Sequence, residues 1–234
     1  AQMYQAMAGM KTNEVLEMTP KLLKMSIAAG SDFAQTSDIV TDNLSAFGMS
    51  ISEADRLMDV MVATSNNANT NVQMLGEAYK YVAASSRNFE SFENVNILLG
   101  VLADNGIKSG QAGRNLAAIY RRLANPSKQV ANALTDLNIQ LYDQQGKFKG
   151  LKTISDELKK ATANLTQEER NRYLAIIAGG EGMKILDSLM GTTEENYNKV
   201  ANGVRNAKGA TDKFADEMSN TTANKIAQFK SALD

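Results

Sequence analysis

Apolar residues recur every three or four positions along nearly the whole chain, which is the spacing of one face of an α-helix. Two such stripes are formed by Phe33, Val40, Leu44 and Phe47 and by Phe92, Val95, Leu99 and Leu102. A glycine follows each stripe, Gly48 in one case and Gly106 in the other, where a left-handed cap would end a helix. The pattern therefore predicts a mainly α-helical fold.

The first half of the chain repeats its own pattern. Asp32-Phe33 is followed by Gly48, Ala54 and Arg56, and Asn88-Phe89 is followed by Gly106, Ala112 and Arg114. This spacing aligns residues of about 12–68 with residues of about 70–126. A repeated unit of this size buries its apolar face against its copy. We predict that residues 1–126 form a bundle of two duplicated helix–turn–helix units.

Polar signals that start helices recur between the stripes. The capping-box pattern, a hydroxyl residue followed three positions later by Glu or Gln, occurs at Ser50/Glu53, Thr70/Gln73, Thr166/Glu169 and Thr192/Glu195. Asn125-Pro126 offers a start of another kind, and Pro20 suggests a new helix after a short one that begins near Thr12. Further helices are predicted over 127–137, 151–163, 167–178, 181–190 and 193–206.

One segment departs from the helical period. Residues 139–149 read as two short strands, Ile139–Tyr142 and Lys147–Lys149, around a turn that contains Gly146. The sequence thus predicts a small β-hairpin within a second unit of residues 127–206.

The last stretch, residues 207–234, carries a narrow apolar stripe. Its members are Phe214, Met218, Ile226, Phe229 and Leu233. Little within the segment itself could cover such a stripe, so we expect a terminal amphipathic helix that contacts a partner.

Composition narrows the possible functions. The chain has 234 residues, two prolines, 22% charged residues and a net charge of −1, so it carries no global attraction to nucleic acid or anionic membranes. It has neither Cys nor His, which removes thiol nucleophiles, disulfides, the usual zinc sites and imidazole catalysis. The longest apolar runs are too short to span a membrane. Because the pattern begins and ends abruptly, we expect a segment of a longer protein.

Three groups of residues invite a chemical interpretation. Asp38/Asp42 and Asp55/Asp59 each place two carboxylates one helical turn apart, but a solvated face explains them better than a cation site or an acid–base pair. Gly179, Gly180 and Gly182 lack the Gly-Lys-Ser/Thr ending of a phosphate loop, so a helix break is expected there. The sequence predicts no catalytic residue, no metal site and no cofactor.

A basic patch is the third group, and its members are Arg114, Arg121, Arg122 and Lys128. Clustered arginines bind phosphate, so contact with DNA is an alternative to protein contact or simple solubility. The neutral chain and the lack of interleaved aromatic residues favour the latter two interpretations.

Several longer stretches resemble the central helical region of phage tail tape-measure proteins. They are Ser37–Gly48 (SDIVTDNLSAFG), Glu77–Val82 (EAYKYV), Gly100–Gly113 (GVLADNGIKSGQAG) and Leu123–Pro126 (LANP). The resemblance implies a structural protein of the virion tail, assembled in the host cytoplasm, that sets tail length and leaves ahead of DNA during ejection. It implies contacts with tail tube, tail assembly chaperone and tail-tip proteins, and several copies in each tail.

The resemblance assigns no catalytic residue. An all-α adaptor that recruits a partner through the terminal helix is the alternative function. A fully helical chain of 234 residues would span only about 350 Å. The glycine turns predict an even more compact fold, so we expect a globular segment of the longer protein, called a station below, and not the length-setting stretch.

Overall fold

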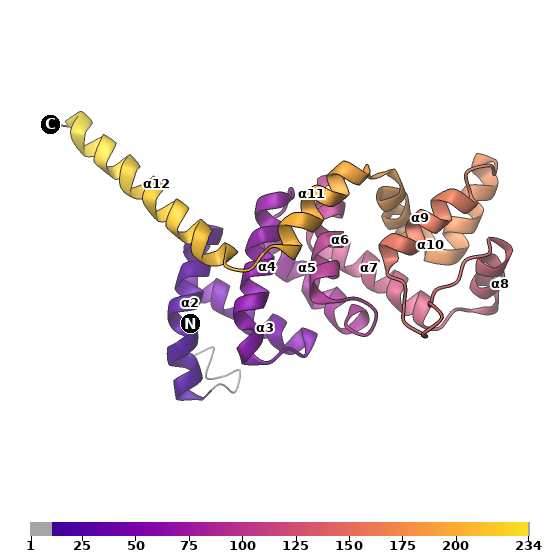
Figure 1. Cartoon of the computed structure of the whole chain (residues 1–234), viewed down its shortest axis with the longest axis horizontal. Coiled ribbons are helices and arrows are strands. Elements are labelled where there is room, and N and C mark those ends of the chain that lie inside the picture. Colours follow the sequence, from indigo (N-terminus) through magenta and orange to yellow (C-terminus); the bar gives the residue numbers. More distant parts are fainter. Residues whose placement is uncertain (1–10, 234) are drawn as a thin grey trace.

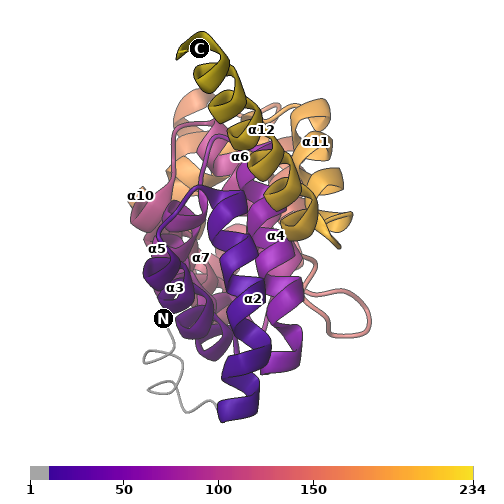
Figure 2. The same cartoon turned by 90° about the vertical axis from the view of Figure 1, so that its left-hand side faces the viewer.

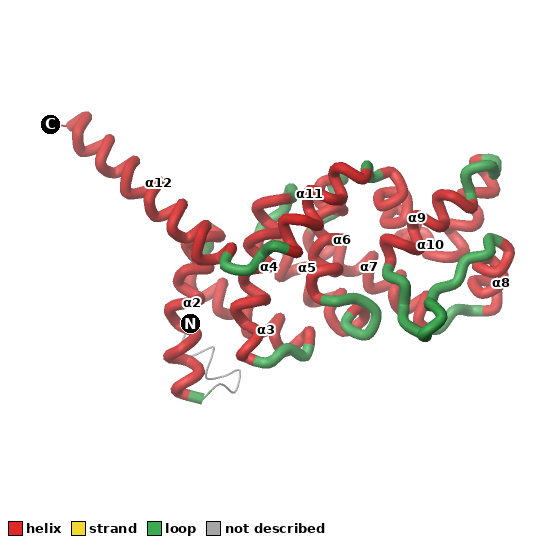
Figure 3. Tube along the Cα trace, in the orientation of Figure 1, coloured by secondary structure: helices red, strands yellow, loops and turns green. Residues whose placement is uncertain are grey.

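The computed structural model describes residues 11–233, although in the last helix the side chains of 222–225 and 227–233 are not described. Within this range the structure is built of helices and contains no β-strand, so the predicted mainly α fold is confirmed (Figures 1 and 3). The helices are α2 (Thr12–Ala29), α3 (Phe33–Phe47), α4 (Ala54–Asn67), α5 (Val72–Ser86), α6 (Phe92–Asp104), α7 (Ser109–Ala124), α8 (Lys128–Asp136), α9 (Leu151–Ala161), α10 (Gln167–Gly191), α11 (Glu194–Arg205) and α12 (Ala210–Leu233), with the short 3₁₀ helix η1 (Ile51–Glu53) before α4.

Helices α5 and α7 form the most extensive helix pair of the described chain. A glycine makes this close approach possible, because a Cβ atom at Gly113 would collide with the backbone carbonyl of Ala78. Around this pair the core is fully buried at Tyr79, Leu116 and Tyr120. The α5–α7 pair therefore forms a tightly packed centre, with α3 packed on α5 and α10 packed on α7.

The two glycines that follow the apolar stripes have the backbone conformation that the sequence predicts. Gly48 is the C-cap of α3 with a φ of 67°, and Gly106 follows α6 with a φ of 82°. Both angles lie in the left-handed region that residues with a Cβ seldom adopt. Each glycine lets the chain turn back into the next helix.

The second half of the chain runs away from the N-terminal helices and then returns. Helix α10 packs on α7, α8 and α9, after which α11 lies along α4 and α6, and the first part of α12 packs on α2 and α4 (Figure 1). A single cluster of buried apolar residues extends from Met18 in α2 to Ala210 in α12. The chain thus leaves the body beside the helix with which the described part begins (Figure 2).

The duplication and the division into three parts remain predictions. The order helix, helix, glycine turn, helix occurs in both α2–α4 and α5–α7. The packing of equivalent helices differs, however, because α5 packs closely on α7 whereas α2 packs mainly on α12.

The expected helix start at Pro20 was wrong, because Pro20 lies inside the continuous helix α2. Proline removes one backbone hydrogen bond from a helix, and the carbonyl that loses its donor belongs to Leu16. Leu16 is 65% exposed, so water can reach this carbonyl, while Met18 and Leu22 hold both sides of the proline in the core. Tertiary packing therefore keeps α2 continuous at Pro20.

The predicted hairpin is reduced to a single antiparallel bridge between Tyr142 and Phe148. The reason is local competition for backbone donors. The Asp143 carboxylate accepts the backbone N–H groups of Gln145 and Lys147, which holds residues 143–147 in a compact turn. Phe148 then enters the core, so the segment packs as a loop and no regular strands form.

Several helix starts are confirmed and others are shifted by one or two residues. The capping boxes of Ser50 and Thr166 are present. Elsewhere the N-cap is the neighbouring Asn71, Ser127 or Thr193, whose side chain accepts a backbone N–H of the first turn. Each of the three has a side-chain oxygen suited to the cap, so adjacent polar residues compete for the position.

We expect Gly113→Ala to lower the free energy of unfolding by about 3 kcal/mol, at the upper end of the cost of overpacking, because the backbone of Ala78 cannot move aside. Urea unfolding followed by circular dichroism measures this change. Gly180→Ala is the matched control, because Gly180 is helical and has open space around its Cβ position. Equal stability of both variants would show that the α5–α7 contact is looser than described.

Candidate interaction site at the start of α12

Two helices in the second half begin after a glycine that has no side chain to cap them. Gly150 precedes α9 with a φ of 88°, and Gly209 precedes α12 with a φ of 78°. The first backbone N–H groups of a helix need an acceptor, which a local Ser, Thr, Asp or Asn usually provides. In both helices a carboxylate from the first half of the chain supplies it.

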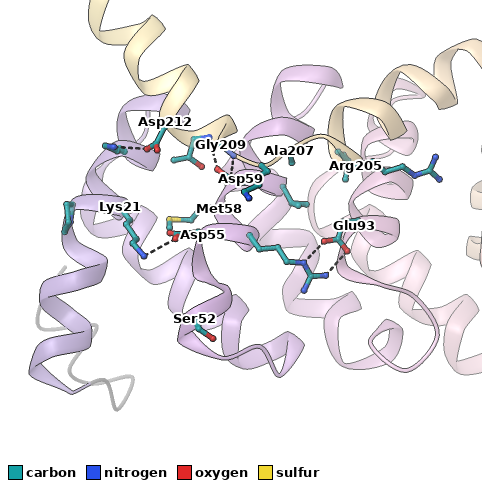
Figure 4. Close-up of a pocket in the computed structure, with 17 residues that line it drawn as sticks. Lys21, Ser52, Asp55, Met58, Asp59, Glu93, Arg205, Ala207, Gly209 and Asp212 are labelled. Carbon is teal, nitrogen blue, oxygen red and sulfur yellow. Dashed lines mark hydrogen bonds and ion pairs between the residues drawn. The ribbon is translucent and has the colours of Figure 1, made fainter.

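Asp59 of α4 caps the start of α12 (Figure 4). One of its carboxylate oxygens accepts the N–H of Gly209 at 2.6 Å, and the other accepts the N–H of Thr211 at 2.9 Å. A carboxylate at this end also interacts favourably with the helix dipole. The cap joins residues that are 150 positions apart in the sequence.

Two ion pairs surround this cap. Lys24 of α2 pairs with Asp212 of α12 at 2.8 Å, and Lys21 pairs with Asp55 of α4 at 3.0 Å. Both pairs are largely exposed, so each contributes little to stability by itself. Together they set which turn of α2 faces α4 and which faces α12.

A groove of about 790 Å³ lies between α2, α4 and the connection from α11 to α12. Met58 and Val60 provide buried apolar surface, and the charged residues described above line the rim. The Thr211 side chain, only 5% exposed, also lines the groove, and its hydroxyl has no hydrogen-bond partner. The start of α12 is therefore fixed by polar contacts as well as by its packing on α2 and α4, and a groove lies beside it.

Arg56 closes another side of the groove through a two-pronged contact with Glu93 of α6. Its Nε lies 2.6 Å from one carboxylate oxygen, and a terminal guanidinium nitrogen lies 2.8 Å from the other. These hydrogen bonds raise the pKa of Arg56 and lower the pKa of Glu93. Arg114, its counterpart in the predicted repeat, instead lies over the ring of Tyr81.

The paired carboxylates of the sequence thus have separate structural contacts. Asp55 turns to Lys21 and Asp59 turns to α12, so the two do not converge on a common point. Asp38 and Asp42 line a polar depression between α3 and α5 together with Glu77. Among the residues that the structure describes, no three such groups are placed to hold a metal ion.

The predicted contact stripe of α12 divides into two parts. Phe214 is partly buried against the core, whereas Met218 is 43% exposed and Ile226 is 53% exposed. Phe229 and Leu233 continue along the same helix, but their side chains lie outside the described residues. The role of the stripe in partner contact remains a prediction.

The predicted basic patch remains a prediction, and two of its arginines have contacts within the chain. Arg122 donates two hydrogen bonds, at 3.1 and 2.9 Å, to the carbonyl of Ile176 in α10. Helix α10 kinks three residues later at Gly179, whose φ of 75° confirms the expected helix break. Arg122 therefore satisfies a carbonyl near the kink, while Arg114 contacts Tyr81 and Arg121 and Lys128 are exposed.

Glu90, in the loop before α6, is the functional counterpart of Asp59. It accepts the N–H of Leu151 at the start of α9 at 2.7 Å and the side-chain amide of Asn94 at 3.0 Å. Burial raises the pKa of Glu90. Burial and the neighbouring Glu90 carboxylate also raise the pKa of Tyr120.

Sequence reasoning missed both long-range caps. The signal that could have found them is a helix start at Gly150 or Gly209 with no local capping residue. Such a start indicates that an acceptor comes from elsewhere, although it does not say from where.

Comparison with known proteins defines the class of this helical protein. The model of the phage-related minor tail protein family matches residues 1–179, so the chain belongs to this family. No helix of the described part is both long and apolar enough to cross a membrane.

The relatives narrow this class to tape-measure proteins. The chain is 33% identical over 230 residues to the tape measure protein of Pneumococcus phage Dp-1, covering 98% of this chain and 20% of that protein. It is 24% identical to the probable tape measure protein of Escherichia phage P2 over all of this chain and 29% of that protein. The chain therefore spans less than a third of each relative. No solved structure matches it significantly.

We expect Glu90→Gln to flatten the pH dependence of stability above about pH 4.5. The folded state raises the pKa of Glu90 above its ordinary value of 4.5, so the folded protein retains this proton longer than the unfolded chain. The contribution of Glu90 to the free energy of unfolding is fully present below pH 4.5, and it is lost as the pH rises through the higher pKa of the folded state. Glutamine keeps an acceptor for the Leu151 N–H and does not ionise.

Urea unfolding of both proteins between pH 4 and pH 8 measures this effect. The difference in unfolding free energy should shift in favour of the variant as the pH rises. Glu93→Gln is the control with the opposite sign, because the pKa of Glu93 is lowered and its contribution is lost on acidification. A pH-independent difference for Glu90→Gln would contradict the assignment.

Proposed function

We propose that this chain is one compact station of a longer phage tail tape-measure protein that acts in tail assembly, tail-length determination and DNA ejection. The observation that carries the proposal is the similarity to the Dp-1 tape measure protein over 98% of the chain. On this proposal the parent protein resides in the virion tail, and the tail is assembled in the host cytoplasm.

The path of the chain supports the role of a station rather than of a rod. Helix α11 returns along α4 and α6, and α12 starts beside the C-terminal half of α2, so the chain folds back toward its N-terminal helices (Figure 1). A ruler gains length by extension, and a chain that folds back adds little of it. The residues that set tail length therefore belong to other parts of the parent protein.

The partners proposed for the parent protein are the tail tube, the tail assembly chaperone, the tail-tip proteins and further copies of itself. For this station, the exposed Ile226 and the projecting half of α12 favour a contact made by that helix. The same feature supports the second candidate function, an all-α adaptor, in which α12 recruits a partner without any ruler.

Mass-spectrometric mapping of purified particles tests the proposal directly. We expect peptides of this chain in a gel band far above 25.3 kDa, the mass of the 234 residues alone. Peptides confined to a free 25.3 kDa polypeptide, or absent from particles, would contradict the ruler assignment and favour the adaptor.

Tail length after deletion tests whether the segment is compact within the tail. An in-frame deletion of residues 1–234 from the parent gene should shorten tails by much less than about 350 Å, the length of the same residues as one straight helix. Electron microscopy of the deletion particles gives this length. A deletion of 234 residues from a continuous helical stretch is the matched control, and equal shortening by both would show that the station unfolds in the tail.

A further inference from the structure

Among the side chains that the structure describes, those of α12 that are buried on the body lie in its first turns. Ala210, Thr211 and Ala215 are buried against the body, and Phe214 is partly buried. Residues 216–221 are all exposed, and the rest of the helix projects beyond the top of α2 (Figure 2). A helix of 24 residues is about 36 Å long. A short contact region at residues 210–215, called the seat below, therefore anchors a long projecting helix.

Polar contacts fix the first turn of this seat, beside the packing of α12 on α2 and α4. Asp59 accepts two backbone N–H groups of the first turn, and Lys24 pairs with Asp212. Hydrogen bonds and exposed ion pairs exchange readily with water, so their net contribution is small compared with that of a packed core. The buried side chains of the seat are alanines and a threonine, which contribute little apolar area.

A groove of about 790 Å³ borders the seat. The Thr211 hydroxyl beside it makes no hydrogen bond to another described protein group. The first turn of α12 is thus bordered on one side by open space and not by packed side chains.

The connection between α11 and α12 allows a change of direction at one point. Only residues 206–209 separate the two helices, and Gly209 has a φ of 78°. Glycine adopts many other backbone angles at low cost, whereas α11 is fixed to α4 and α6. Rotation about this residue would move α12 as a unit and leave the body unchanged.

We propose that α12 is a lever latched by Asp59, which alternates between the seated position and a released one by rotation at Gly209 while the body stays folded. Release frees the helix face formed by Thr211, Phe214 and Ala215, which continues into the already exposed Met218. This inference goes beyond the proposed function and does not depend on the length or identity of the parent protein.

Spin labels test the lever directly, because the chain has no cysteine of its own. Asn88→Cys on the body and Thr221→Cys on α12 are both exposed positions, and double electron–electron resonance gives the distribution of distances between them. With Asp59 intact we expect one dominant narrow distance. Asp59→Ala removes both cap contacts and should increase the released, broadly distributed population by roughly 2- to 30-fold, as expected for the loss of a helix cap.

Asp55→Ala is the matched control, because Asp55 lies one turn from Asp59 in the same groove but contacts Lys21 and not α12. It should leave the distance distribution unchanged. The latch would be overturned if Asp59→Ala and the protein with Asp59 intact gave the same distance distribution. It would also be overturned if Asp59→Ala and Asp55→Ala broadened the distribution equally.

Hydrogen exchange of the protein without substitutions provides a second test, which holds even if Asp59→Ala does not fold. The amides of Gly209 and Thr211 should exchange far faster than those around Tyr79 in α5, and with little dependence on denaturant, as expected for a local opening. Exchange of these two amides only through global unfolding would overturn the proposal.

Discussion

The need of a helix for acceptors at its N-terminus organises the second half of this protein. Helices α9 and α12 follow glycines, and their first N–H groups are accepted by Glu90 and Asp59 from the first half of the chain. Each carboxylate therefore does two things at once. It satisfies a local backbone requirement, and it fixes where a distant helix starts relative to the core.

The two caps differ in their surroundings, which gives them different consequences. Glu90 is shielded between the α5–α6 loop and α9, and its raised pKa reflects that burial. Asp59 sits at the rim of a groove, with exposed ion pairs and an unfilled space beside it. The first cap lies within the packed body, whereas the second holds an arm that projects from it.

For a member of the phage-related minor tail protein family, the path of the chain matters as much as its helix content. The Dp-1 tape measure protein is about five times as long as this chain, so most of its length lies outside the matched part. The described chain folds back on itself, with α11 and α12 returning to α2 and α4. On the proposed function, such a fold presents surfaces and an arm along the tail and contributes little to tail length.

The sequence by itself determined the helical class, the glycine turns at Gly48 and Gly106, the capping boxes of Ser50 and Thr166 and the break at Gly179, because each depends on residues within one or two helical turns. Only the tertiary structure decided the continuity of α2 through Pro20, the loss of the expected strands, and the roles of Glu90, Asp59 and Arg122. In these cases the outcome depends on packing, on competition for backbone donors, or on partners more than 50 positions away. The spacing of neighbouring residues in the sequence does not indicate such contacts.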